Sequence, residues 1–154
     1  MTSDQGEPAD ARSTRSVRVR RALDASPERT FRAWADPDEL ARWFPQRVEG
    51  SLSVGSRTHL VWPSERLWWD VVEADPNRRF RFRWPWLDGR LVTAVTVQIT
   101  PRGYGTLVEL DDGPFNLRDP DGLDAFAECC EGWGEALTLL RARLDFDVDV
   151  RPRR

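Results

Sequence analysis

The sequence contains no lysine: all 23 basic residues are arginines, set among 26 acidic residues that leave a net charge of −3. Because the arginines are interspersed with acidic side chains rather than forming a long basic face, a nucleic-acid partner is not expected. No apolar run approaches the roughly 20 residues that a membrane span needs, and the first residues lack the apolar segment of a secretory signal. The composition therefore predicts an intracellular, cytoplasmic protein that binds neither nucleic acid nor membranes.

Residues that carry metal or catalytic chemistry are almost as scarce. The single histidine, His59, has no His or Cys partner at metal-ligand spacing, and the single tyrosine, Tyr104, lies in a glycine-flanked turn. Cys129 and Cys130 are adjacent on a predicted helix, where their side chains point about 100° apart and cannot form an unstrained disulfide. The sequence shows no nucleophile elbow, Ser-His-Asp set or phosphate-binding glycine loop. We therefore expect no metal, no cofactor and no catalytic residue.

What the chain does contain is a series of short alternating segments typical of β-strands. Val17 and Val19 alternate with arginines near the start of the chain. The segment "RRFRFRW" gives the clearest pattern, with aromatic and arginine side chains on opposite faces. Further strand-like segments, separated by short turns such as "PSER" and "DPN", continue to about Leu110. Strands in direct succession, without a parallel βαβ rhythm, predict an antiparallel sheet with one buried face.

Three helices are predicted from capping and periodicity. Ser26 before Pro27 starts "PERTFRAWA", and Asp36 before Pro37 starts "PDELARWF". The longest helix is expected over residues 120–146, where apolar side chains recur at helical spacing along one stripe. The predicted order is therefore one strand, two short helices, a run of strands and a long final helix.

One stretch of the final helix, "EGWG", places Gly132 and Gly134 on either side of Trp133. Each glycine inside a helix costs about 1 kcal/mol relative to alanine. Burying a tryptophan offsets this cost, because truncating one in a core typically costs about 3–5 kcal/mol. We therefore expect Trp133 to insert into the concave side of the sheet, and the glycines to let a neighbouring element approach the helix closely.

Three segments, "ASPERTFRAWADPDELARWF", "VEADPNRRFRFRW" and "EGWGEALTLLRARL", resemble the activator of heat-shock protein 90 ATPase-like family of the START-like (SRPBCC) superfamily. The resemblance implies an α+β helix-grip (START-like, Bet v-like) fold. In that fold a curved antiparallel sheet of six to seven strands wraps around a long C-terminal helix, with two short helices after the first strand. The expected organisation is a disordered tail over residues 1–15, the helix-grip domain over residues 16–147 and a C-terminal tail over residues 148–154.

In such folds the sheet and the long helix commonly enclose a cavity for a small hydrophobic molecule. Carried over to this chain, the residues expected to line it are Leu60, Trp62, Trp68, Asp70, Phe82, Trp84, Val95, Val97, Val108, Leu110, Asp112, Phe126, Trp133 and Leu137. Thr58 and Val72 would share these inward faces. A simpler interpretation, which we favour, is that the tryptophans are core residues, since aromatic side chains dominate core energetics. The two interpretations are compatible, because a cavity wall is also core.

Asp70 and Asp112 would both point into this apolar interior. A carboxylate there must be paired, hydrogen-bonded or hydrated, or it takes up a proton through a raised pKa. Either acid would then serve as a polar handle for a ligand or as a general acid/base. The alternative, which we favour, is that one or both lie at a strand end in water, because Asp112 adjoins Asp111 and a Gly-Pro turn.

Three functions follow from these observations. The leading hypothesis is non-enzymatic binding of a small hydrophobic or aromatic molecule between sheet and helix. The second is an enzyme resembling the polyketide aromatase/cyclases, in which Asp70 or Asp112 moves protons. The third is a protein-interaction module, in which Arg79, Arg81 and Arg83 dock a partner such as a chaperone, a contact that the sequence itself does not support. A homodimer also stays open.

Overall fold

The computed structural model describes residues 13–152, so most of the predicted N-terminal tail lies outside the described residues. The strands are β1 (Thr14–Leu23), β2 (Arg47–Glu49), β3 (Arg57–Trp62), β4 (Glu65–Asp75), β5 (Arg79–Trp86), β6 (Leu91–Arg102) and β7 (Gly105–Asn116). The helices are α1 (Pro27–Ala35), α2 (Pro37–Leu40) and α3 (Pro120–Phe146), with one 3-10 turn, η1 (Leu87–Gly89).

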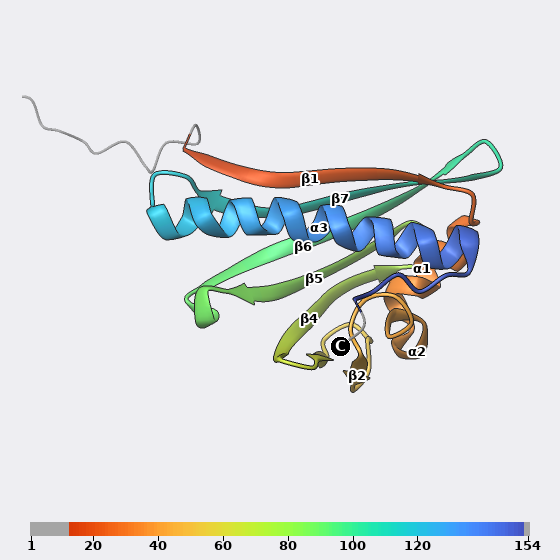
Figure 1. Ribbon diagram of the computed structural model, residues 1–154, viewed down its shortest axis with the longest axis horizontal. Helices are drawn as coiled ribbons and strands as arrows, with labels where there is room; N and C mark the ends of the chain where they lie inside the picture. Colours follow the sequence, from red (N-terminus) through yellow and green to blue (C-terminus); the bar gives the residue numbers. More distant parts are fainter. Residues whose placement is uncertain (1–12, 153–154) are drawn as a thin grey trace, which may run out of the picture.

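The strands form one antiparallel, seven-stranded sheet in the order β1-β7-β6-β5-β4-β3-β2. α3 crosses one face of this sheet and packs mainly on β1 and β7, while α1 contacts α3 and the strands β5 and β6 (Figure 1). This arrangement confirms the predicted α+β helix-grip architecture, including the two short helices after the first strand.

The short helices begin at the predicted caps. The Ser26 hydroxyl accepts a hydrogen bond from the Arg29 amide at 3.2 Å, and Asp36 accepts from two amides at the start of α2. α2 ends at Leu40, earlier than the segment "PDELARWF" predicted. The turn that follows contains a 3-10 bond from Trp43 N to Leu40 O as well as an α-type bond from Phe44 N to the same oxygen, and the Trp43 indole donates to the Ala33 carbonyl at 2.9 Å.

The core between sheet and α3 is filled by aromatic rings. Trp133 is 1% exposed, which confirms that it inserts into the concave side of the sheet. Its ring centroid lies 4.9 Å from that of Trp84, 5.5 Å from Phe44 and 6.0 Å from Trp34. Offset and edge contacts of this kind add to the stability gained from area burial alone. Indole and phenyl groups of the protein itself therefore occupy the space between α3 and the sheet around Trp133.

The predicted inward face of β4 is wrong. Trp69 and Val71 are buried, whereas Trp68 and Asp70 lie on the other face and Val72 is 44% exposed. The pairing of β4 with β5 shifts register between Val71 and Glu73. This β-bulge switches the faces within the strand, so strict two-residue alternation cannot assign them along its whole length.

The expected role of the two helix glycines is also wrong. A Cβ atom built on Gly132 or Gly134 would meet no atom within 4 Å outside the helix. No element therefore approaches the helix closely enough to require a glycine at either position. Gly132 instead lies on an open cleft, described below.

Candidate functional site

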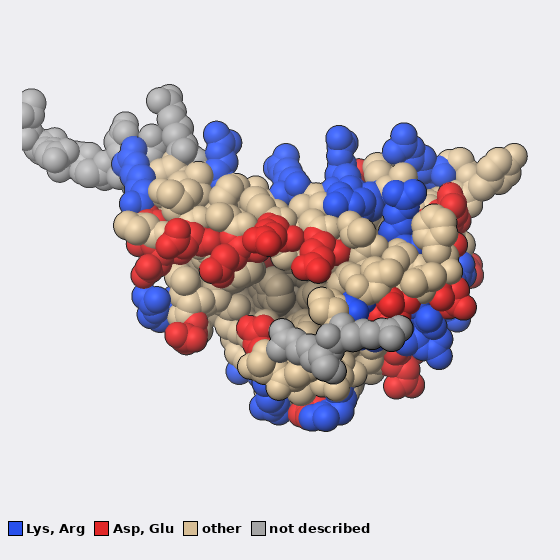
Figure 2. All heavy atoms as spheres, in the orientation of Figure 1, with Lys and Arg blue, Asp and Glu red and all other residues tan. Residues whose placement is uncertain are grey.

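A cleft of about 570 Å³ opens beside α3 and is the best candidate for a binding site in the described part of the chain. Pockets of roughly 300–1,000 Å³ are typical of small-molecule sites. The space-filling view shows this surface hollowed below a row of acidic side chains (Figure 2). Its lining comes from α3, β3, the turn after α2 and the C-terminal segment: Phe44, Gln46, Trp62, Pro63, Gly132, Glu135, Ala136, Leu139, Asp149, Arg151 and Pro152.

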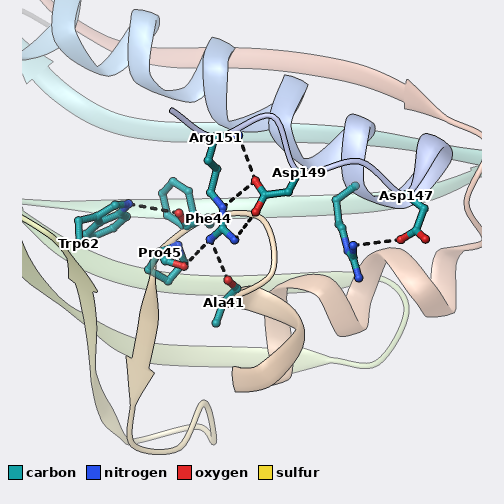
Figure 3. Close-up of polar contacts among 8 residues, drawn as sticks. Ala41, Phe44, Pro45, Trp62, Asp147, Asp149 and Arg151 are labelled. Atoms are coloured by element: carbon teal, nitrogen blue, oxygen red, sulfur yellow. Dashed lines mark hydrogen bonds and ion pairs between the residues drawn. The ribbon is translucent and has the colours of Figure 1, made fainter. Parts of the chain in front are cut away.

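Phe44 and Trp62 supply the aromatic wall of the cleft. Their ring centroids are 5.2 Å apart at an interplanar angle of 88°, an edge-to-face contact. The Trp62 indole donates a hydrogen bond to the Phe44 carbonyl oxygen at 3.2 Å (Figure 3). Both rings are therefore held in place by packing and by a hydrogen bond, and both remain partly exposed to the cleft.

α3 supplies a second wall with little side-chain bulk. Gly132 and Ala136 lie one turn apart on the helix, and Leu139 continues the apolar surface. Glu135 places a carboxylate at the same cleft. Since nothing would block a Cβ atom on Gly132, the open volume beside this residue is maintained by the absence of a side chain.

The segment after α3 closes another side of the cleft. Asp147, the C-cap residue of α3, adopts the left-handed conformation, with φ 53°. The chain then turns back toward α2 (Figure 1). One nitrogen of the Arg151 guanidinium donates to the carbonyl oxygens of Ala41 and Pro45, both at 2.8 Å (Figure 3). Its other nitrogens bind both carboxylate oxygens of Asp149, at 3.0 and 2.7 Å.

These contacts stabilise the ionised form of the Asp149 carboxylate. The hydrogen bonds from Arg151 lower the pKa of Asp149 to about 2, so this carboxylate is ionised near neutral pH. The fork geometry satisfies the guanidinium on three sides, which is typical of bidentate Arg–carboxylate pairs. The pair holds residues 149–152 as a fixed wall rather than as a free tail.

Of the sequence-predicted site residues, the structure brings Trp62 to this cleft. Most of the others are buried in the core: Leu60, Phe82, Trp84, Val95, Val97, Val108, Leu110, Asp112, Trp133 and Leu137. Phe126 is half-buried and packs edge-to-face on Phe115 at 6.0 Å. The cleft thus lies at the surface, between α3, β3 and the C-terminal segment, and not in the space between helix and sheet, which side chains fill.

Trp68 and Asp70 lie on the outer face of the sheet, contrary to the prediction that they point inward. The Arg57 guanidinium binds both oxygens of Asp70, at 2.7 and 2.9 Å, and stacks over the Trp68 ring at 4.1 Å. This hydrogen bonding lowers the pKa of Asp70. Asp70 is therefore an ion-paired acid on the outer face, as the alternative expected, but it lies within β4 rather than at a strand end.

Asp112 behaves in the opposite way and contradicts the favoured strand-end interpretation. It is 0% exposed, and its Oδ2 atom accepts from the indoles of Trp133 and Trp84, at 2.9 and 3.0 Å, and from the Cys129 thiol at 3.2 Å. Its Oδ1 atom has no hydrogen-bond partner among the described residues. Burial raises the pKa of Asp112, while hydrogen bonding to the carboxylate, including that from Trp133, Cys129 and Trp84, opposes the shift. Asp112 therefore ties α3 to the sheet from inside the core.

Sequence reasoning missed Phe44, Gln46, Gly132 and the segment 149–152 as parts of a site. Phe44 and Gln46 follow a short helix and carry no motif. Residues 148–152 follow the final helix, and the alternation of Val148 and Val150 with Asp149 and Arg151 does not by itself indicate where the segment docks. The two glycines were the one available signal, because their helix-propensity cost required an explanation.

The described residues hold no group of three or more His, Cys, Asp and Glu side chains that could bind a metal ion. Within residues 13–152, no helix combines the length and apolar character that crossing a membrane requires.

Solved structures with the same fold share little sequence with this chain. Protein MLL2253 from Mesorhizobium loti has a TM-score of 0.76 at 24% identity, and the match covers 87% of this chain and 99% of that one. The Aha1 dimer from Colwellia psychrerythraea has a TM-score of 0.73 at 21% identity, with 85% and 96% covered. DynU16, a protein from the dynemicin biosynthetic locus, has a TM-score of 0.76 at 22% identity, with 89% of this chain and 49% of that chain covered.

Among curated proteins, none matches the sequence significantly. A family model does match: residues 24–145 fit the family described as Activator of Hsp90 ATPase homolog 1-like protein. This range runs from the end of β1 almost to the end of α3 and so includes most of the cleft-lining residues. The chain belongs to the Activator of Hsp90 ATPase homolog 1-like protein family.

Proposed function

We propose that the protein binds a small aromatic molecule in the cleft between α3, β3 and the C-terminal segment. The observation that carries this proposal is the combination of an open volume of about 570 Å³ with a fixed aromatic wall, Phe44 and Trp62. Pockets lined by apolar and aromatic groups, with a few placed polar groups, are the usual form of small-molecule sites. Here the polar groups are Gln46, Glu135 and the Asp149–Arg151 pair.

The glycine at the cleft supports the same proposal. Gly132 costs the helix about 1 kcal/mol relative to alanine, and no packing contact in the structure offsets that cost. A glycine at this position leaves open volume that a ligand could occupy, and ligand binding would account for its cost. Proteins commonly give up stability where function requires it.

Binding is favoured over turnover because the acid that the cyclase alternative requires is inaccessible. Asp112 is 0% exposed and does not line the cleft, and Asp70 is paired with Arg57 on the outer face. The interaction-module alternative loses support at two of its three residues, because Arg79 and Arg81 both pair with Glu73 on their own face of the sheet. Arg83 is exposed and has no ion-pair partner among residues 13–152. A homodimer stays a proposal, suggested by the dimer of the Colwellia psychrerythraea relative, and light scattering of the purified protein tests it.

Blocking the cleft from its glycine wall tests the proposed function. A panel of small aromatic probes, including indole and 2-naphthylmethanol, is examined by saturation-transfer NMR with wild-type protein, Gly132→Leu and Gly134→Leu. Gly134→Leu is the matched control, because it makes the same change in the same helix and Gly134 does not line the cleft. Circular dichroism and thermal unfolding establish that both variants are folded.

We expect wild type and Gly134→Leu to bind at least one probe, and Gly132→Leu to lose that binding. Native mass spectrometry of freshly purified protein adds an unbiased measurement, because a co-purifying aromatic compound should be lost only from Gly132→Leu. Equal binding by all three proteins would show that probes bind elsewhere. Absence of binding across the panel would refute the proposed function.

A further inference from the structure

The positive charge that lines the cleft is fully engaged by the protein itself. Among residues 13–152, Arg151 is the only basic residue that lines the cleft. Its guanidinium donates to two carbonyl oxygens and to both oxygens of Asp149. Figure 3 shows this group turned into the protein, between Asp149 and the carbonyls of Ala41 and Pro45. A guanidinium held in this way is poorly placed to bind the anionic group of a ligand.

The negative charge of the cleft, in contrast, is not neutralised. Glu135 lines the cleft, is exposed, and has no ion-pair partner among residues 13–152. Glu131 and Glu128 precede it by four and seven residues, which places them on the same exposed side of α3. Neither has an ion-pair partner in the described chain. Figure 2 shows a row of acidic side chains along the edge of the hollow. A cleft bordered by charge of one sign concentrates the field at its opening and attracts ligands of opposite sign.

The aromatic wall works in the same direction. The faces of tryptophan and phenylalanine rings are electrostatically negative and attract ammonium groups within about 6 Å. Trp62 presents such a ring to the same volume that Glu135 borders, whereas the ring of Phe44 is stacked against Trp43 and Trp133. A cationic ligand would therefore gain from the Glu135 carboxylate and from the Trp62 ring at once, whereas an anionic ligand would meet no free positive group among the lining residues that the structure describes.

We propose that this cleft selects aromatic molecules that carry a protonated amine over neutral or anionic molecules of the same shape. This inference rests on the proposed function and adds the charge class of the ligand. Glu135 is the residue that recognises the amine, and the Arg151–Asp149 pair keeps the other wall free of competing charge.

Three probes that share one ring system test this selectivity: 2-naphthylmethylamine, 2-naphthylmethanol and 2-naphthoate, which are cationic, neutral and anionic at pH 7. Dissociation constants are measured by NMR titration with wild type, Glu135→Gln and Glu109→Gln. Glu109 is the matched control, since it lies on the exposed face of β7, away from the cleft, and its substitution changes the net charge equally. Each titration is repeated at 20 mM and 300 mM salt.

We expect the amine to bind about fivefold more tightly than the alcohol, because an exposed ion pair contributes up to roughly that factor. The preference should shrink at high salt and in Glu135→Gln, and it should persist in Glu109→Gln. Equal binding of all three probes would overturn the charge selectivity and leave the proposed function intact. An amine preference that survives in Glu135→Gln would overturn the role of Glu135. If no probe binds, the proposed function fails together with this inference.

Discussion

Replacing the two helix glycines by alanine should stabilise this protein. Gly132 and Gly134 lie inside α3, and a Cβ atom on either would meet no atom within 4 Å. Each substitution therefore gains helix propensity, about 1 kcal/mol, without a steric cost. Side chains two residues apart on a helix do not face each other, so the two gains should add to about 2 kcal/mol in the double variant.

Thermal unfolding followed by circular dichroism measures this gain. For a domain of this length, 1 kcal/mol corresponds to a change in Tm of about 2–4 °C, so the double variant should melt about 4–8 °C higher. Gly122→Ala is the control within the same helix. Its added Cβ would collide with the Asn116 carbonyl oxygen, and it should lower Tm although it makes the same chemical change.

A decrease in Tm for Gly132→Ala or Gly134→Ala would refute this reasoning. It would mean that another element packs against this flank of α3, as the sequence alone had suggested. An increase confined to Gly134→Ala would locate the close contact at Gly132 and remove the argument for an open cleft at that position.

Two further predictions concern the ionisable groups of the core and of the C-terminal segment. Because burial raises the pKa of Asp112, the folded state binds this proton more tightly than the unfolded state, and stability should fall as pH rises from about 4 through the folded pKa. Urea unfolding between pH 4 and 8 should show this fall in wild type relative to Asp112→Asn, and parallel profiles would contradict it. Arg151→Ala should raise the pKa of Asp149 from about 2 toward its ordinary 3.8 and speed amide exchange in residues 148–152. An unchanged carboxyl titration by NMR would show that Arg151 does not hold the segment.

The elements that could be predicted from sequence are those set by local patterns. Ser26 and Asp36 cap their helices because their side-chain oxygens reach amides two or three residues away. The alternation in "RRFRFRW" places Phe80 and Phe82 in the core because β5 is regular over that segment. The burial of Trp133 followed from the helical stripe it belongs to.

The features that could not be predicted depend on contacts between distant residues. The bulge in β4 between Val71 and Glu73 depends on pairing with β5. Ala74 packs on the core after it, whereas Trp69 and Val71 are the buried residues before it, so Ala74 does not share a face with Trp68 and Asp70. The environment of Asp112 comes from Trp84, Cys129 and Trp133, which lie on two other elements. Residues 148–152 dock because Arg151 meets carbonyl oxygens more than a hundred positions earlier.

The aromatic side chains that fill the core explain why the candidate site lies at the surface beside α3 rather than between helix and sheet. Trp133 and Trp84 occupy the space between helix and sheet, and the Oδ2 atom of Asp112 holds both indoles in place. A ligand entering that space would have to displace side chains whose truncation typically costs about 3–5 kcal/mol each. Binding in the existing cleft requires no such displacement, because Gly132 already leaves room beside α3. In a helix-grip protein with so many core tryptophans, ligand binding in the cleft beside the middle of α3 is therefore energetically favoured over binding beneath the helix.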